Sequence, residues 1–180
     1  MASPNVLILR APGTNCDAET SFAFERAGAA TTKLHVNALR EDPSQLQSYQ
    51  ILAIPGGFSF GDDVGAGKIL AAGLEHFLSD AVREFRDAGK LILGVCNGFQ
   101  VLLKAGLLMP GDDDGPVATL AHNVSAKFED RWVHLAATPG NCPFLKGVDR
   151  MYLPVAHGEG NFVTREEWIQ KGLAQAGQFV

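Results

Sequence analysis

The chain has 180 residues, of which 46% are hydrophobic and 19% are charged, a balance typical of a globular protein with one sizeable core. Its 20 acidic and 15 basic residues give a formal net charge of −5, which argues against a nucleic-acid-binding protein. The apolar run near the N-terminus follows no basic stretch and is too short for a signal peptide or a membrane span. Three widely spaced cysteines without a CxxC pair indicate a reducing cytoplasm and no zinc site.

The first half of the sequence alternates between strands and helices. Short apolar runs predict buried strands at residues 6–9, 32–36, 51–54 and 91–95. A helix is expected from the turn at 12–15 to Gly28, with Asn15 or Asp17 as its N-cap. A second helix at 75–88 would end at Gly89 and place five residues on one apolar face: Phe77, Leu78, Ala81, Val82 and Phe85.

Continuous apolar strands separated by amphipathic helices indicate an α/β fold with a mostly parallel sheet that is covered on both faces. Because residues 91–95 are apolar on both faces, we expect this strand to be central in the sheet. We see no linker, so residues 1–180 are expected to form a single domain.

After Pro110 the pattern changes. Residues 117–122 and 131–137 predict two strands in a small antiparallel excursion, and residues 151–155 predict another strand. Residues 164–176 predict a helix that begins in a capping box of Thr164 and Glu167 and stops at Gly177. Residues 178–180 look like the beginning of a strand. The acidic run at 112–114 lies in a loop rich in Gly and Pro, which favours a solvated turn over a metal site.

Cys96 lies where the strand at 91–95 gives way to a helical pattern, between Gly94 and Gly98. A thiol at the tip of such a tight turn stands clear of the sheet, and the small neighbours let the backbone turn without a clash. The N–H groups of the following helix favour the thiolate, which is the reactive form. We therefore interpret Cys96 as a nucleophile, against the alternative of an ordinary buried thiol.

A thiolate that attacks an amide needs donors for the oxyanion that forms. The N–H group of Asn97, directly after the nucleophile, is one candidate. The second is expected from the loop after the strand at 51–54, where Gly56 and Gly57 have no side chains and the backbone can approach a substrate closely.

Five stretches occur in an order that identifies a family resemblance: RAPGTNCDAET (10–20), IPGGFSFGDD (54–63), GVCNGFQVLL (94–103), HNVSAKFEDRWVHL (122–135) and PVAHGEGNF (154–162). Together they resemble the glutaminase component of phosphoribosylformylglycinamidine synthase, a class I (triad) glutamine amidotransferase of de novo purine biosynthesis. The resemblance covers nearly the whole chain. It implies a flavodoxin-like doubly wound fold, a γ-glutamyl thioester intermediate, and ammonia passed to a large synthetase subunit.

The resemblance assigns Cys96 as the nucleophile, Gly57 and Asn97 as the backbone oxyanion donors, and Gly56 and Gln100 as contacts of the glutamine. It implies no cofactor or metal in this chain, since the synthetase partner uses the ATP and Mg. A third small subunit is a further partner to expect. Neither a nucleic acid nor a membrane is implied, and the cytoplasm is the expected location.

In this family the histidine and glutamate of the triad come from a Pro-His-Pro-Glu segment, and residues 1–180 contain no such segment. The chain is therefore expected to lack its C-terminal strands and the triad's second half, and to hydrolyse glutamine poorly. His157 and Glu159 have suitable residue types and could form the dyad, although the HGEG motif fits better as a lining of the site or a contact with the synthetase. His35 and His134 are expected to be structural, and neither Cys16 nor Cys142 is expected to be catalytic.

Two other functions remain open. The chain could be a catalytically silent partner subunit or a fragment of the same family. It could also be another α/β protein with a thiol at a strand–helix turn, such as a cysteine hydrolase, but the purine-family motifs argue against that alternative.

Overall fold

The computed structural model describes residues 3–137 and 142–178. The chain divides into two compact units, residues 1–110 and residues 111–180, and each is described here by itself. The prediction of a single domain stays a prediction. Within the described ranges, no helix is long and apolar enough to cross a membrane.

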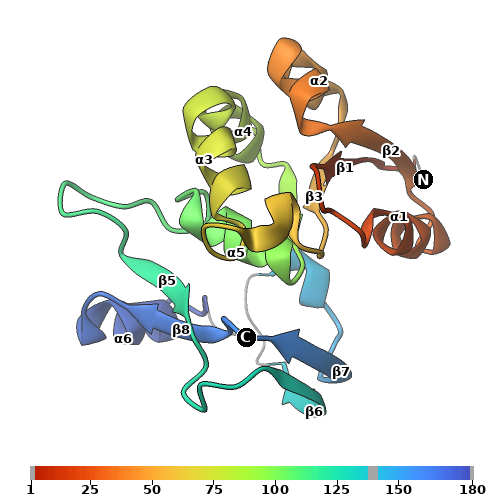
Figure 1. Ribbon diagram of the computed structural model, residues 1–180. Coiled ribbons are helices and arrows are strands. Elements are labelled where there is room, and N and C mark those ends of the chain that lie inside the picture. Colours follow the sequence, from red (N-terminus) through yellow and green to blue (C-terminus); the bar gives the residue numbers. More distant parts are fainter. Residues whose placement is uncertain (1–2, 138–141, 179–180) are drawn as a thin grey trace. The chain divides into compact units, whose positions relative to one another are not determined.

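The first unit contains a parallel sheet of four strands (Figure 1). Its strands are β1 (Asn5–Arg10), β2 (Ala30–His35), β3 (Ile51–Ile54) and β4 (Leu91–Gly94), in the order β2-β1-β3-β4. All three neighbouring pairs are parallel, so the predicted α/β fold with a mostly parallel sheet is confirmed. The strand order reverses between β1 and β3, which is where open sheets of this kind bind ligands, beyond the carboxyl ends of the strands.

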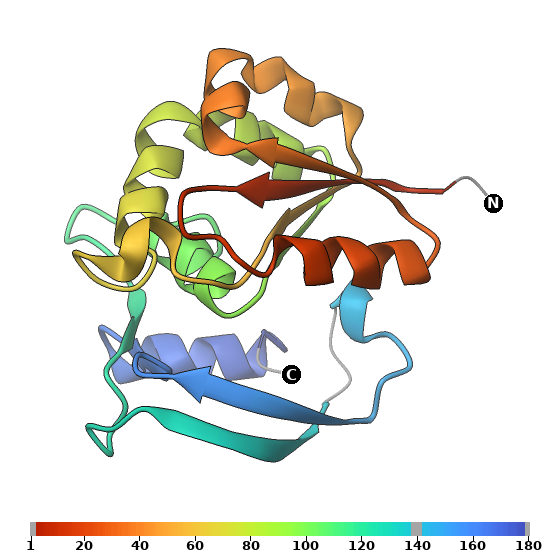
Figure 2. The ribbon, with the colours of Figure 1, turned by 45° about the vertical axis from the view of Figure 1, so that its right-hand side comes forward.

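Helices cover both faces of this sheet. They are α1 (Asp17–Arg26), α2 (Val36–Glu41), α3 (Lys68–Phe77), α4 (Ser79–Asp87) and α5 (Asn97–Lys104), with the 3₁₀ helices η1 (Pro43–Ser48) and η2 (Ser59–Asp62). Figures 1 and 2 show α1 on one side of the sheet and α2 and α4 on the other. Leu7 and Leu9 of β1 belong to the main core with Leu39 of α2 and Phe85 of α4. Alternate residues of one strand serve opposite faces, so the residues between them face the α1 side.

The prediction that the strand at 91–95 is central is wrong for the part of the chain that the structure describes. There β4 pairs with β3 alone and forms the edge of the sheet, its four residues are half-buried, and Val95 is exposed. The apolar pattern of a strand reports what covers its two faces. It carries no information about whether its outer hydrogen-bonding edge is occupied.

The helix predicted at 75–88 is two helices, because the backbone at Leu78 leaves the helical region with φ −130°. Leu78, Val82 and Phe85 are buried as expected, and Ala81 packs against the core. Phe77 is exposed, contrary to the prediction, because it ends α3 and the break changes the helical phase. Gly89 has φ +74° directly after the C-cap of α4, which confirms the predicted stop.

Neither residue expected as the N-cap of α1 caps it with a side chain. The N-cap is Cys16, Asp17 is the first helical residue, and the Asp17 carboxylate pairs with Arg10 at 2.9 Å. The side-chain oxygen of Asn15 accepts a hydrogen bond from the Cys16 thiol at 3.4 Å. The Asp17 carboxylate is therefore paired with Arg10 at the end of β1 and does not cap the helix.

The second unit contains two antiparallel pairs and a helix. β5 (Ala118–Ala121) pairs with β8 (Asn161–Thr164), and β6 (Glu129–Ala136) pairs with β7 (Arg150–His157). The antiparallel excursion is confirmed, but its two predicted strands pair with later strands rather than with each other. The unit also contains η3 (Pro143–Leu145) and α6 (Glu167–Gln175).

The capping box at 164–167 is wrong, because Thr164 ends β8, a strand that the sequence did not predict. The N-cap of α6 is Glu166, and no side chain caps the helix. Gly177 follows the helix with φ +66°, as expected of a stop. Of the strand predicted at 178–180, residues 179–180 lie outside the described residues.

Candidate active site

Cys96 lies at the turn between β4 and α5, as its flanking sequence predicts. It is the N-cap of α5 and is exposed. Its backbone has φ 52° and ψ −111°, a conformation that residues with a side chain rarely adopt. Such a strained turn presents its side chain beyond the end of the sheet, which is the geometry of a nucleophile elbow.

The glycines on either side of Cys96 are required by close contacts. A Cβ atom on Gly98 would lie 1.9 Å from the carbonyl oxygen of Ile54 at the end of β3. One on Gly94 would lie 2.7 Å from the carbonyl oxygen of Gly98 and 2.6 Å from a methyl carbon of Leu102. The strand and helix thus approach more closely than side chains allow, which confirms the expected role of small residues here.

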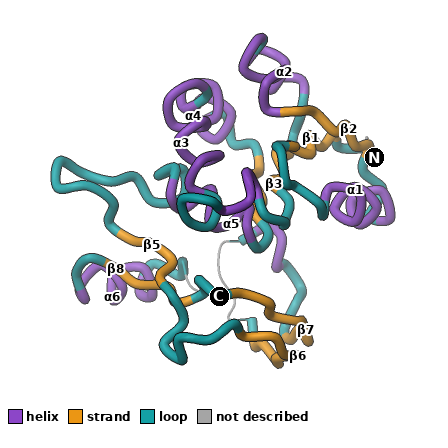
Figure 3. Tube along the Cα trace, in the orientation of Figure 1, coloured by secondary structure: helices purple, strands orange, loops and turns teal. Residues whose placement is uncertain are grey.

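The loop after β3 is held by the loop after β1, residues 12–16, and both can be followed in Figure 3. The N–H group of Cys16 donates to the carbonyl of Gly56 at 3.3 Å, and that of Phe58 donates to the carbonyl of Gly13 at 3.0 Å. The Gly56 carbonyl and the Gly57 N–H group belong to one planar peptide unit. The bond from Cys16 therefore fixes the direction in which the candidate oxyanion donor points.

Gly57, like Gly94 and Gly98, lies too close to neighbouring atoms to carry a side chain. Its φ is +133°, and a Cβ atom there would lie 2.8 Å from both the backbone nitrogen and the side-chain oxygen of Asn15. From the sequence, residues 12–15 were expected only as the turn before a helix, with Asn15 as a candidate N-cap. The structure places this turn as the support of the Gly56–Gly57 loop.

At Gly56, the loops after β1 and β3 both lie close to Cys96. A Cβ atom on Gly56 would lie 3.3 Å from Cβ of Cys96 and 3.6 Å from the sulfur of Cys16. The residues assigned from the sequence as nucleophile, oxyanion donors and glutamine contact therefore meet at one end of the sheet. Their roles in a reaction remain predictions.

The side chain of Asn97 joins the nucleophile turn to the loop after β3. It is buried, and its oxygen accepts from the N–H group of Ser59 at 3.2 Å and from the Ser59 hydroxyl at 2.7 Å. Its nitrogen donates to Asp62 and to Gln100, both at 3.1 Å. All four hydrogen-bonding positions of the amide are used, so this network holds both candidate donor segments in one arrangement. Sequence reasoning assigned only the Asn97 backbone and missed this role.

Gln100 lies in the same network. It is buried in α5, and its side-chain oxygen accepts from Asn97. This contact gives Gln100 a structural task beneath the turn, whereas the expected contact with glutamine stays a prediction.

Cys16 is a second thiol close to the candidate nucleophile. Partial burial raises its pKa above the ordinary thiol value, and electrostatic interactions with Glu19, Cys96 and Asp17 raise it further. A raised pKa leaves less thiolate at a given pH, so Cys16 is less reactive than a thiol of ordinary pKa with the same exposure.

His157 and Glu159, the tentative residues of the HGEG motif, lie in the second unit. The buried amide of Asn123 donates to the carbonyls of Lys127 at 2.9 Å and His157 at 2.8 Å, and its oxygen accepts from the N–H group of Gly160 at 3.0 Å. That oxygen lies 2.9 Å from Nδ1 of His157, so Nδ1 donates and the lone pair of the neutral imidazole is on Nε2.

Gly160 completes this arrangement, because a Cβ atom there would lie 2.1 Å from Nδ1 of His157. The motif therefore builds a tight turn with an oriented imidazole. That the motif lines the site or contacts the synthetase, rather than forming a dyad with Cys96, stays a prediction.

The other histidines have local contacts. His35 accepts from the N–H group of Asn37 and so caps α2, and His134 stacks on Tyr152 with ring centroids 4.4 Å apart. Both contacts are structural, as expected. Asp112 in the acidic run pairs with Arg165 of the loop before α6. Among the described residues, no three His, Cys, Asp or Glu side chains cluster in a way that could hold a metal ion.

Comparison with known proteins places these motifs in context. Residues 3–180 match the family described as CobB/CobQ-like glutamine amidotransferase domain. The chain is 50% identical over 172 residues to "Phosphoribosylformylglycinamidine synthase subunit PurQ" of Dehalococcoides mccartyi, covering 95% of this chain and 68% of that protein. The subunit of the same name from Methanococcus maripaludis strain C7 is 42% identical over 166 residues, covering 91% of this chain and 61% of that one. The chain thus spans 61% to 68% of the length of these relatives.

Two solved structures have the same fold. The PurLQS structure from Thermotoga maritima matches with a TM-score of 0.75 and 29% identity, over 92% of this chain and 72% of that one. A glutamine amidotransferase from Thermotoga maritima matches with a TM-score of 0.56 and 18% identity, over 91% of this chain and 64% of that one. The second match concerns the fold alone.

Proposed function

Since this chain belongs to the family of CobB/CobQ-like glutamine amidotransferase domains and, within it, to the PurQ subunits of phosphoribosylformylglycinamidine synthase, we propose that it is the glutaminase component of that enzyme. It would release ammonia from glutamine for the synthetase, which converts formylglycinamide ribonucleotide to formylglycinamidine ribonucleotide. The observation that carries this proposal is the strained turn that presents Cys96 beside the Gly56–Gly57 loop.

The reaction begins when the Cys96 thiolate attacks the side-chain amide carbon of glutamine. The carbonyl oxygen becomes an oxyanion, and the N–H groups of Gly57 and Asn97 are the donors that stabilise it. Removal of one such donor typically slows catalysis about 10²–10³-fold. The carbon–nitrogen bond then breaks, the departing nitrogen takes a proton from water and leaves as ammonia, and a γ-glutamyl thioester remains on Cys96. Water hydrolyses the thioester to glutamate and regenerates the thiol.

Binding of the substrate is assigned to the same loops. Gly56 lets the backbone approach the glutamine closely, and Gln100 contacts it from α5. His157 and Glu159 stay candidates for lining the site. The chain itself needs no metal or cofactor for this reaction, because the thiolate and the backbone donors supply its chemistry.

The partner in this proposal is the large synthetase subunit, which uses ATP and Mg and accepts the ammonia. A third small subunit is a further candidate partner. The relatives are named as a subunit of a synthase, which supports a multi-subunit assembly, and a cytoplasmic location fits a step in nucleotide biosynthesis.

The test is amidine formation by the mixture of this chain with the synthetase subunit. With glutamine as the nitrogen source we expect a product that Cys96→Ala reduces to background. With an ammonium salt we expect equal product with either chain, because the synthetase then needs no glutaminase. Equal glutamine-dependent product with Cys96→Ala would overturn the proposal, and ammonium-dependent product alone with the unaltered chain would favour a catalytically silent subunit.

A further inference from the structure

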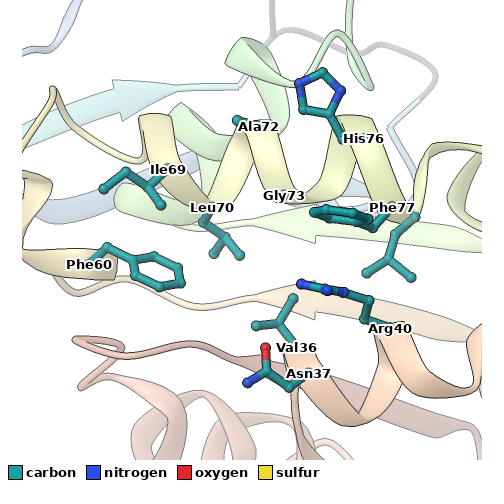
Figure 4. A pocket seen from close by; sticks show the side chains of 11 residues that line it. Val36, Asn37, Arg40, Phe60, Ile69, Leu70, Ala72, Gly73, His76 and Phe77 are labelled. Atoms are coloured by element: carbon teal, nitrogen blue, oxygen red, sulfur yellow. The ribbon is translucent and has the colours of Figure 1, made fainter.

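A pocket of about 270 Å³ lies between α2 and α3 in the first unit (Figure 4). Val36 and Arg40 of α2 line one side, Leu70 and Phe77 of α3 line the other, and Phe60 of η2 closes one end. None of these residues belongs to the candidate active site. Most of the lining side chains are apolar, and Asn37, Arg40 and His76 are the polar ones, so the main part of the pocket fits an apolar group.

The charged group in the wall is the guanidinium of Arg40. It lies flat over the ring of Phe77, with its central carbon 4.1 Å from the ring centroid. Within the described part of the chain, no carboxylate lies at ion-pair distance from Arg40. Stacking on an aromatic ring orients the planar guanidinium and leaves its N–H groups available for a carboxylate. The pocket therefore fits an apolar side chain that is flanked by a carboxylate.

The surroundings of the pocket favour a protein over a small molecule. Two of the large apolar side chains that line the pocket are themselves exposed, Ile69 (37%) and Phe77 (55%). Neighbouring exposed apolar side chains at the mouth of a pocket are typical of a surface that another protein covers. Arginine and aromatic residues are also the types that dominate the binding energy of protein interfaces.

The position of the pocket in the chain indicates which protein binds there. Phe60 follows the candidate oxyanion donor Gly57 by three residues, and Asp62 holds Asn97. Phe60, Gly61 and Asp62 all have φ between 54° and 72°, so the backbone of this segment is strained. The same segment contributes Phe60 to the pocket and Asp62 to the hydrogen bonds of Asn97. A protein that consumes ammonia must bind close to the site that releases it, or the ammonia is lost to water.

We propose that this pocket, the Arg40–Phe77 pocket, is a docking site for the synthetase subunit, which inserts an apolar side chain next to an aspartate or glutamate that pairs with Arg40. The inference rests on the proposed function for the identity of the partner. It adds the surface, the chemistry of the contact and the residues that make it.

Two variants test the two features of the pocket separately. Arg40→Glu reverses its charge. Gly73→Leu fills it, because a side chain added at this helical position meets nothing within 4 Å. Each has a matched control. Arg26 also stacks on an exposed phenylalanine, Phe22 at 5.8 Å, so Arg26→Glu makes the same change elsewhere. Gly172 is a helical glycine of α6 with the same open space, so Gly172→Leu is the control for Gly73→Leu.

The measurement is the dissociation constant of this chain with the synthetase subunit, by calorimetry. We expect Arg40→Glu and Gly73→Leu each to weaken binding about tenfold or more, since a central contact of an interface is lost. We expect both controls to bind within about twofold of the unaltered chain. Labelling of Cys96 by an electrophilic glutamine analogue is measured on every variant and is expected to be unchanged.

Unaltered affinity in both pocket variants would overturn the docking site while leaving the proposed function intact. If the pocket variants instead dissociate a dimer of this chain and bind the synthetase normally, the pocket serves a second copy and the proposal is wrong. Failure of the unaltered chain to bind the synthetase also overturns it. Failure of Cys96 labelling with normal binding would count against the glutaminase function alone.

Discussion

Gly98 and Gly73 are both helical glycines, yet their surroundings differ completely. A methyl group on Gly98 would collide with the backbone of β3, whereas one on Gly73 meets open space. We expect Gly98→Ala to lower the free energy of unfolding by roughly 1–3 kcal/mol through overpacking. We expect Gly73→Ala to raise it by up to about 1 kcal/mol through helix propensity. Urea unfolding of both variants measures the difference, and changes of the same sign would contradict the contact geometry.

Cys16 provides a test by pH. Burial and nearby negative charges raise its pKa, so at any pH below that value less of it is thiolate than in an unperturbed thiol. We expect its alkylation by iodoacetamide to be slower at neutral pH than that of an unperturbed thiol, and to go on accelerating above about pH 8.5, the ordinary thiol pKa, where the rate of an unperturbed thiol levels off. A mass-spectrometric rate profile for each cysteine checks this. Rapid alkylation of Cys16 near pH 7 would show that the carboxylates and burial do not control it.

At this scale the sequence predicted the turn that carries Cys96 better than the contacts that support it. A cysteine between glycines at a strand–helix junction is typical of a nucleophile elbow, and the structure confirms this turn, whereas the reactive role of Cys96 and the donor roles of Gly57 and Asn97 stay predictions. The contacts from Cys16 to Gly56 and from Asn97 to Ser59 join residues about 40 positions apart in the chain. No local pattern records such contacts.

At the scale of elements, the pairing of Asp112 with Arg165 can be tested by acid. The Arg165 guanidinium lowers the pKa of the Asp112 carboxyl below its ordinary value, chiefly through their hydrogen bond. A lowered folded-state pKa contributes stability that is present above the unfolded-state pKa and is lost as the pH falls through the folded-state value. Asp112→Asn should therefore lower the urea midpoint slightly at pH 7, and the difference should shrink as the pH falls below about 4.

Asp113→Asn removes the same charge from the neighbouring position and serves as the control. A pH-independent difference for Asp112→Asn, or an equal effect of Asp113→Asn, would mean that the ion pair does not stabilise the loop.

The positions of strands and helices were predictable from the hydrophobic periodicity, whereas the partners and the order of the strands were not. The strands of the parallel sheet were expected at the right places because each is a short apolar run between turn signals. The edge position of β4 and the pairing of β5 with β8 depend on hydrogen bonds to distant segments. The break at Leu78 was missed because Leu78, Val82 and Phe85 continue the apolar pattern across it.

At the scale of the whole molecule, Cys96 is proposed as the nucleophile and the N–H groups of Gly57 and Asn97 as the oxyanion donors, whereas His157 is interpreted as lining the site or contacting the synthetase rather than as the general base. A general acid–base contributes about 10²–10⁴-fold to such a reaction. Loss of the general base would slow hydrolysis by a factor of this order, so we expect glutamine hydrolysis by residues 1–180 and by their His157→Ala variant to differ by far less than this. Release of glutamate measures both. Fast hydrolysis that His157→Ala abolishes would make His157 the base, with Asn123 as the residue that orients it.

The measurement that tests the central claim most directly is the site of covalent labelling by a glutamine analogue that carries an electrophilic ketone. Such an analogue reacts with the residue that attacks the amide carbon of glutamine. The covalent adduct is the end product, so the labelling requires no hydrolysis step and no general base for it. Digestion and mass spectrometry of the labelled chain should show one adduct on Cys96, with Cys16 and Cys142 unmodified and with protection by excess glutamine. An adduct spread over all three cysteines, or absent from Cys96 in the folded chain, would contradict the assignment of Cys96 as the nucleophile.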